Sequence, residues 1–156
     1  MKVAIVFGGV SFEHEISIVS AIAMKDVLSD ELVYIFLDEN RDFYHIPSKT
    51  IKSKLFSSQE YKKCDKINIC KNGFSKKTGL LGKEKPLEFD VVLNLSHGGD
   101  GEDGLLSSVL EFYNIPFIAP RTEACVVSSN KFLTKGYAHS VSVNTLGLIS
   151  GVLPNF

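Results

Sequence analysis

The sequence has 156 residues, of which 44% are hydrophobic and 22% are charged, and its formal net charge is −1. This length suits one compact domain, which can bury roughly 70% of the surface of its unfolded chain. The near-neutral charge gives no reason to expect nucleic acid or an anionic membrane as principal partner. The three cysteines lack the spacing of a zinc site or a disulfide framework, which favours a reducing, cytoplasmic location. No apolar run approaches the roughly 20 residues of a membrane span, and we expect neither a span nor a signal peptide.

The first elements form a βαβ unit. Residues 2–7, "KVAIVF", are apolar without alternation, which is typical of a strand covered on both faces. Two glycines end this run, and Ser11 is a suitable N-cap for a helix that continues to about residue 29. A second apolar run at 32–37 predicts a parallel partner strand. The helix is expected to bury one apolar stripe, formed by Ile16, Val19, Ala23 and Val27, with Ile22 beside it.

Residues 42–88 differ in character, because their short strand-like runs and turns suggest a small antiparallel insertion. Between Lys49 and Lys85 there are eleven lysines and three acids. Scattered aromatic residues, Phe56, Tyr61 and Phe74, are compatible with a nucleic-acid surface that stacks bases. Lysine-rich segments ordinarily face water, however, so we interpret this one as a solvated insertion.

The parallel pattern resumes with predicted strands at 89–96 and 115–120 and a predicted helix from Glu123 to about His139. The final run at 144–156 begins like another strand but ends on apolar residues, and it looks cut rather than finished. Together these elements predict an α/β fold with an open, Rossmann-like parallel sheet of about four strands and flanking helices. The helix between the last two strands is expected to bury Leu105, Leu106, Val109, Leu110 and Tyr113.

Two glycine-rich loops follow strands of this sheet, "FGGVSFEHEIS" at 7–17 and "SHGGDGEDG" at 96–104. Ligands bind open parallel sheets beyond the carboxyl ends of the strands, where such loops lead into helices. Glycine allows a ligand to approach backbone N–H groups closely, and a helix amino terminus adds partial positive charge. The two loops are therefore expected to converge into a single pocket, with Glu13 and His97 facing the same ligand.

The acids and the histidine of these loops each have two interpretations. Glu15 fits an acid that complements the helix dipole, whereas Glu13 lies nearer the loop mouth and could hold a substrate ammonium group. His97 closes a buried strand, as either a hydrogen-bonded packing residue or a site residue. Glu102 and Asp103 could be architecture or ligand contacts, and Asp103 is well placed to cap the next helix.

The two motifs, followed by "SNK" at 129–131, resemble the amino-terminal domain of bacterial D-alanine–D-alanine ligases. The first is similar to the family's G-G-x-S-x-E-x-E-[IV]-S and the second to H-G-x-x-G-E-D-G, and the resemblance covers about residues 2–135. It implies a substrate-binding pre-ATP-grasp domain at 1–127, then a hinge and the start of the ATP-grasp region at 128–156. The rest of the family's ATP-binding domain is not in this sequence. We therefore expect this chain alone to be inactive.

The resemblance also implies a reaction and its residues. In such ligases ATP, with Mg²⁺ or Mn²⁺, phosphorylates the carboxylate of a first D-alanine, and the amine of a second D-alanine attacks the acylphosphate to make a peptidoglycan precursor. Carried over by motif, Glu13 binds the first ammonium group and Ser17 supports it in the substrate site. His97 contacts the substrate near the acylphosphate, Gly98 keeps the backbone close, and Lys131 reaches the nucleotide. No metal ligand is expected among the present residues.

The family is usually dimeric through this domain, and apolar helix residues such as Leu106 or Tyr113 are candidates for the interface. The chain departs from the family at "GLLSS" after the second motif, at "IAPRTEA" after the fourth strand, and at Asn130, where the family has aspartate. An alternative interpretation is a free-standing module that holds a phosphate or nucleotide, although the sequence has no GxxxxGK[ST] and no GxGxxG directly after the first strand. A structural protein that has lost catalysis is a third possibility.

Overall fold

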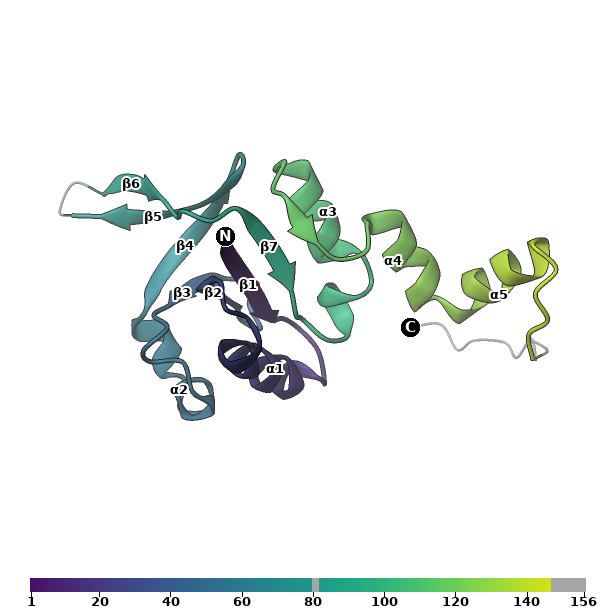
Figure 1. The fold of residues 1–156 in the computed structure, drawn as a ribbon, viewed down its shortest axis with the longest axis horizontal. Coiled ribbons are helices and arrows are strands. Elements are labelled where there is room, and N and C mark those ends of the chain that lie inside the picture. Colours follow the sequence, from purple (N-terminus) through teal and green to yellow (C-terminus); the bar gives the residue numbers. More distant parts are fainter. Residues whose placement is uncertain (80–81, 147–156) are drawn as a thin grey trace.

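A computed structural model describes residues 1–79 and 82–146, and its centre is one open sheet of eight strands in the order β6-β5-β4-β3-β2-β1-β7-β8 (Figure 1). One half of the sheet is parallel and confirms the predicted α/β class. Its strands are β1 (Lys2–Gly8), β2 (Glu31–Leu37), β7 (Val91–Asn94) and β8 (Phe117–Ile118).

The other half makes the sheet larger than the expected four strands. The predicted antiparallel insertion is present, but its first strand pairs with β2, so it extends the same sheet instead of forming a separate unit. A strand can pair in parallel on one edge and antiparallel on the other, and the sequence pattern does not reveal that choice. The added strands are β3 (Phe43–Ile46), β4 (Asp65–Cys70), β5 (Gly73–Thr78) and β6 (Lys83–Pro86).

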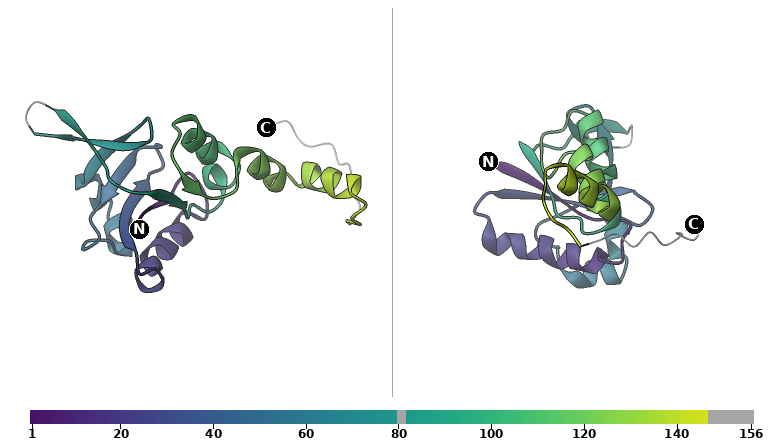
Figure 2. Two further views of the ribbon diagram at one scale, coloured as in Figure 1. Left: turned by 45° about the horizontal axis from the view of Figure 1, so that its top comes forward. Right: turned by 90° about the vertical axis from the view of Figure 1, so that its right-hand side faces the viewer.

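The continuous apolar run of β1 is explained by helices on both faces of the sheet. Phe7 and Ile5 belong to a core shared with α1 (His14–Val27), whereas Val6 belongs to a second core shared with α3 (Leu105–Phe112). Because successive side chains of a strand point to opposite faces, residues 3–7 of β1 all carry apolar side chains. Figures 1 and 2 show the two helices on opposite sides of the sheet.

The face that α1 buries is not the predicted one. Ile16 and Val19 are 54% and 60% exposed, and Ala23 and Val27 are exposed as well. The buried residues are instead Ser17, Ile18 and Ala21, with Ile22 partly buried. A prediction from apolar residues alone places a serine on the exposed face of a helix. Here the Ser17 hydroxyl is buried because it makes hydrogen bonds inside the protein.

The lysine-rich segment contains two short helices, α2 (Ser53–Ser57) and the 3₁₀ helix η1 (Glu60–Lys63), that the sequence did not predict. They bring Phe56 and Tyr61 into the core beneath α1, while Phe74 of β5 is buried in the core on the other face. These rings are therefore structural and are not free to stack on bases. The surface interpretation holds for the lysines alone.

Beyond β8, the single helix predicted from Glu123 to His139 is two helices, α4 (Thr122–Ser129) and α5 (Lys131–Ser140). Asn130 separates them and caps α5, since its side chain accepts hydrogen bonds from the backbone N–H groups of Phe132 and Leu133. Both helices run away from the sheet, and α5 has no buried residue (Figures 1 and 2).

Two further expectations concern the surface and the end of the chain. Leu106 of α3 is buried in the core, so it is not available for a dimer interface. The strand-like run predicted at 144–156 lies almost wholly outside the described residues. Within 1–79 and 82–146, no helix combines the length and the apolar character needed to cross a membrane.

Candidate functional site

The two glycine-rich loops pack directly against each other, as the sequence predicted. Gly98 has a φ of +63°, and a methyl group on it would lie 2.5 Å from Ser11 Oγ and 3.0 Å from Glu13 Oε2. Gly99 has a φ of +43°, and a methyl group there would lie 2.1 Å from the carbonyl oxygen of Val10. Only glycine fits both the backbone conformation and the space at these positions. The Glu13 carboxylate consequently borders the backbone of the second loop.

Ser17 holds the strands from which these loops depart. Its side chain is completely buried, and its Oγ accepts a 2.7 Å hydrogen bond from the N–H of Gly8 at the end of β1. The same hydroxyl donates a 2.9 Å hydrogen bond to the carbonyl oxygen of Leu95, just after β7. One side chain of α1 therefore ties together the carboxyl ends of the two central strands.

We expect Ser17→Ala to lower the free energy of unfolding of the 156-residue chain by about 1–3 kcal/mol, because two buried backbone groups lose their partner. Urea denaturation followed by circular dichroism measures this change. The control is Ser140→Ala, since the Ser140 hydroxyl bonds only to the Tyr137 carbonyl of its own helix. Equal stability losses for the two variants would show that the Ser17 hydroxyl does not hold the ends of β1 and β7 together.

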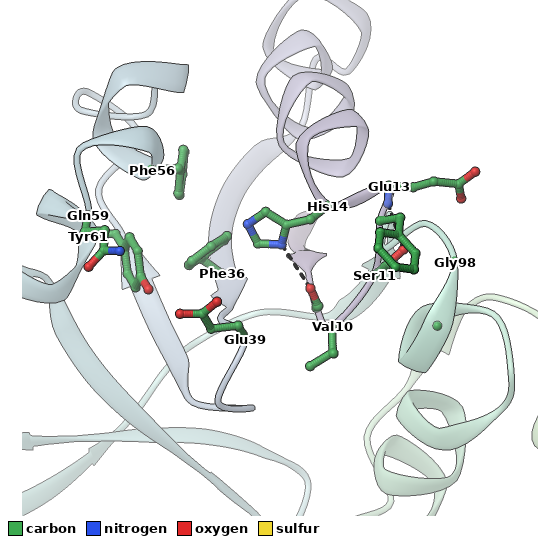
Figure 3. Close-up of a pocket in the computed structure, with 13 residues that line it drawn as sticks. Val10, Ser11, Glu13, His14, Phe36, Glu39, Phe56, Gln59, Tyr61 and Gly98 are labelled. Carbon is green, nitrogen blue, oxygen red and sulfur yellow. Dashed lines mark hydrogen bonds between the residues drawn. The ribbon is translucent and has the colours of Figure 1, made fainter. Parts of the chain in front are cut away.

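Beside the first loop lies a hollow of about 800 Å³, which we call the glycine-loop hollow; it is lined by Gly9, Val10, Ser11, Phe12, Glu13, His14, Phe36, Glu39, Phe56, Gln59, Tyr61, Gly98 and Gly99. Phe36, Phe56 and Tyr61 form its aromatic wall (Figure 3). Burial, followed by the nearby Asp38 carboxylate, raises the pKa of Tyr61 to about 12. The wall is therefore uncharged at neutral pH.

Within this hollow, Glu13 lies on the side of the second loop. Figure 3 shows its side chain pointing away from Phe36 and Phe56 and its carboxylate on the side where Gly98 lies. The side chain is exposed and no protein cation pairs with it among the ion pairs of the described residues. A carboxylate in this position can bind an ammonium group that enters from solvent.

His97 is adjacent to Gly98 in the chain but lines a different hollow. This histidine hollow has a volume of about 500 Å³ and is lined by Asn94, Leu95, Ser96, His97, Gly101, Glu102, Ala119, Pro120, Cys125, Ser128 and Ser129. The two loops converge as predicted, but the structure does not show the expected single pocket in which Glu13 and His97 face the same ligand, because Glu13 lines the glycine-loop hollow and His97 lines the histidine hollow. Gly98 and Gly99 border the first hollow, and Gly101 borders the second.

Both ring nitrogens of His97 lie near polar side chains. Nε2 is 3.4 Å from Ser20 Oγ, and Nδ1 is 3.8 Å from Glu102 Oε1. The His97 side chain remains 39% exposed, so its ring is oriented without being enclosed. The sequence analysis missed Ser20, although its position three residues after Ser17 places it on the same side of the helix.

The acids of the second loop divide between architecture and the site. Asp103 accepts a 2.8 Å hydrogen bond from the N–H of Leu105, which is the helix-capping role considered from the sequence. Glu102 faces His97 and lines the histidine hollow. Asp100 is buried and pairs with Arg41, a residue that no sequence motif pointed to.

Lys131 is the first residue of α5, is exposed, and belongs to neither hollow in the described part of the chain. Among residues 1–79 and 82–146, no three His, Cys, Asp or Glu side chains gather closely enough to hold a metal ion. The role of Lys131 toward a nucleotide therefore stays a prediction.

Comparison with known proteins agrees with this fold and these loops. Residues 2–120 match the family described as "D-ala D-ala ligase N-terminus". The chain is 58% identical over 146 residues to the D-alanine–D-alanine ligase of Campylobacter jejuni subsp. doylei, covering 94% of this chain and 42% of that protein. It also matches the crystal structure of the Helicobacter pylori ligase with a TM-score of 0.86 and 52% identity, covering 94% of this chain and 46% of that one.

The fold extends to more distant proteins, since the VanG D-Ala:D-Ser ligase of Enterococcus faecalis superposes with a TM-score of 0.74 at 22% identity. The chain spans less than half the length of the relatives it matches. Its mixed sheet, its two interlocked glycine loops and the match over residues 2–120 lead to one assignment: the chain belongs to the family of D-alanine–D-alanine ligase amino-terminal domains.

Proposed function

We propose that this chain is the amino-terminal part of an enzyme that joins two D-alanine molecules with ATP, and that it supplies the binding site of the first D-alanine. The observation that carries the proposal is the position of the Glu13 carboxylate, exposed and against the backbone of Gly98. The high identity to ligases over 94% of this chain supports the same reaction.

In this proposal Glu13 binds the ammonium group of the first D-alanine. An opposite charge at one end of a small zwitterion fixes which end faces the reaction, and such orientation supplies a large part of catalysis. Gly98 keeps the loop backbone close to the substrate because no side chain intervenes. Ser17, being buried, acts by holding the ends of β1 and β7 and not by touching the substrate.

His97 donates a hydrogen bond toward the negative charge that develops as the first carboxylate is activated. Ser20 Oγ, 3.4 Å from Nε2, orients the ring, and Nδ1 is available to donate because Glu102 Oε1 lies 3.8 Å away, beyond hydrogen-bond distance. ATP, with Mg²⁺, supplies the phosphoryl group that activates the carboxylate. The ligands of the metal ion come from residues outside those described here, and Lys131 approaches the nucleotide only when the α5 region packs against the rest of a full-length ligase.

We further propose that the enzyme works in the cytoplasm as a homodimer. The exposed apolar residues Ile16 and Val19 of α1 support a contact with another protein surface. Of the helix residues first considered for this role, Tyr113 remains partly exposed.

The direct test compares the 156-residue chain with a full-length ligase that carries it. We expect the full-length protein, given ATP, Mg²⁺ and D-alanine, to release phosphate and form D-alanyl-D-alanine, and the 156-residue chain to release no phosphate above background. The reason is that, in this proposal, the ATP-binding part of the full-length ligase supplies the ligands of the metal ion and most contacts to the nucleotide. A coupled phosphate assay with chromatography of the dipeptide measures both.

The matched variant is His97→Ala in the full-length protein, which should lower kcat by about 100-fold while changing the KM for D-alanine less, as loss of one donor to developing charge does. Unchanged activity would return His97 to a packing role. Nucleotide or phosphate binding by the 156-residue chain, with no ligation by the longer protein, would favour the alternative of a free-standing binding module.

A further inference from the structure

A bidentate ion pair links two loops, and the two paired residues are 59 positions apart in the sequence. Arg41 Nε is 2.7 Å from Asp100 Oδ2, and Arg41 Nη2 is 3.1 Å from Asp100 Oδ1. The Asp100 side chain is only 10% exposed, whereas that of Arg41 is 59% exposed. The guanidinium therefore covers a carboxylate that would otherwise be buried without a counter-charge.

The arginine end of this pair has a rigid base. Asp38 at the end of β2 is 1% exposed, and its Oδ1 accepts 2.9 Å hydrogen bonds from the N–H groups of Asn40 and Asp42. The N–H of Arg41 in turn donates a 3.0 Å hydrogen bond to the Asp38 carbonyl oxygen. These bonds hold Arg41 at a φ of +62°, a conformation that residues other than glycine rarely adopt. These hydrogen bonds fix the backbone of the 38–42 turn independently of the ion pair between Arg41 and Asp100.

The aspartate end lies in the turn that shapes the proposed substrate site. Asp100 is the central residue of η2 (Gly99–Gly101), which is closed by a 3.1 Å hydrogen bond from the N–H of Gly101 to the Gly98 carbonyl oxygen. The same turn places Gly98 against Glu13. A shift of this turn would therefore change the distance between the Glu13 carboxylate and the loop backbone.

From these contacts we infer that Arg41 is a positioning residue, which sets the width of the first D-alanine site by holding the 98–101 turn through Asp100. This inference rests on the proposed function. An isolated ion pair on the surface contributes little to the stability of a protein. The Arg41–Asp100 pair differs from such an isolated pair because its carboxylate is buried, its geometry is bidentate and the backbone of its arginine is held by Asp38. Neither Arg41 nor Asp38 lines the glycine-loop hollow.

The test uses Arg41→Gln, with Lys66→Gln as matched control. Lys66 makes a 2.6 Å ion pair with Asp42, so the control removes a similar pair from the same turn without affecting the second loop. In the 156-residue chain, we expect amide hydrogen exchange at residues 98–103 to become about tenfold faster in Arg41→Gln and to stay unchanged in the control, because local opening becomes easier.

In the full-length ligase, Arg41→Gln should raise the KM for D-alanine about tenfold with kcat within about twofold, since a displaced loop weakens substrate positioning. Arg41→Lys should have a KM between those of Arg41→Gln and the wild type, because lysine keeps the positive charge but cannot make the two parallel hydrogen bonds of a guanidinium group. The double variant with Asp100→Asn should be no worse than Arg41→Gln alone, as expected of two residues that act as one unit.

Exchange at 98–103 that is the same in Arg41→Gln and Lys66→Gln would overturn the inference. So would faster exchange with an unchanged KM, because the turn would then be unconnected to the site. If the full-length wild-type protein ligates nothing, the proposed function fails, whereas the exchange measurement still decides whether Arg41 holds the turn.

Discussion

Glu13→Gln in the full-length ligase is expected to raise the KM for the first D-alanine by about 10- to 100-fold, which corresponds to a charge-assisted hydrogen bond of about 1.5–3 kcal/mol. Glutamine keeps the size of the side chain and its contact with Gly98 but loses the counter-charge for the ammonium group. Initial rates at varied D-alanine and saturating ATP measure the change. An unchanged KM would remove Glu13 from the site.

Glu15→Gln is the natural comparison, because it removes the same charge two residues away, from the first turn of α1, where Glu13 is the N-cap residue. Glu15 does not line the glycine-loop hollow and, in the described structure, its side chain is exposed. We expect its KM for D-alanine to stay within about twofold of the wild-type value, since an acid in the first turn affects the helix by only about 0.3–1 kcal/mol. Equal effects of the two variants would point to net charge and not to a specific contact.

Gly99→Ala is expected to be among the most destabilising single changes in the chain, at about 2–4 kcal/mol. The added methyl group would lie 2.1 Å from the Val10 carbonyl oxygen, which is backbone and can move only if the first loop moves. The cost combines overpacking with a positive φ that alanine disfavours. Urea denaturation of the 156-residue chain measures the loss, and full-length protein should also bind D-alanine less well because the loops are forced apart.

Gly136→Ala provides the opposite expectation. Gly136 lies within α5, and a methyl group on it would meet nothing within 4 Å. Alanine favours a helix over glycine by about 0.5–1 kcal/mol, so this variant should be as stable as the wild type or slightly more stable. If Gly99→Ala were also as stable as the wild type, the two loops would not be packed as closely as described.

The parallel half of the sheet could be predicted from the sequence because its signals are local. The unbroken apolar runs of β1 and β2 indicate strands covered on both faces, and Gly8 and Gly9 mark the carboxyl end of β1. The convergence of the two loops followed from that topology, since parallel neighbours end at the same edge. The rule needs no knowledge of side-chain contacts.

Other features depend on contacts between distant residues, which local patterns do not contain. The buried face of α1 could not be predicted, because Ser17 is buried for its two hydrogen bonds to Gly8 and Leu95 and not for its hydrophobicity. In the Arg41–Asp100 ion pair, Arg41 belongs to a turn that matches no sequence motif. Asp100 belongs to the second glycine-rich loop, which attracted attention only because of its glycines. His97 faces a separate hollow because Ser20 and Glu102 orient its ring, and neither contact has a signature in the sequence.

An open sheet has two free edges, and each could in principle accept a strand from another molecule. At one edge β6 reads Lys83, Glu84, Lys85, Pro86, all exposed, so charge and a missing N–H discourage pairing. At the other edge β8 has only two residues and is flanked by Pro116 and Pro120. In the described part of the chain, both edges of the sheet are therefore poor templates for a strand of another molecule.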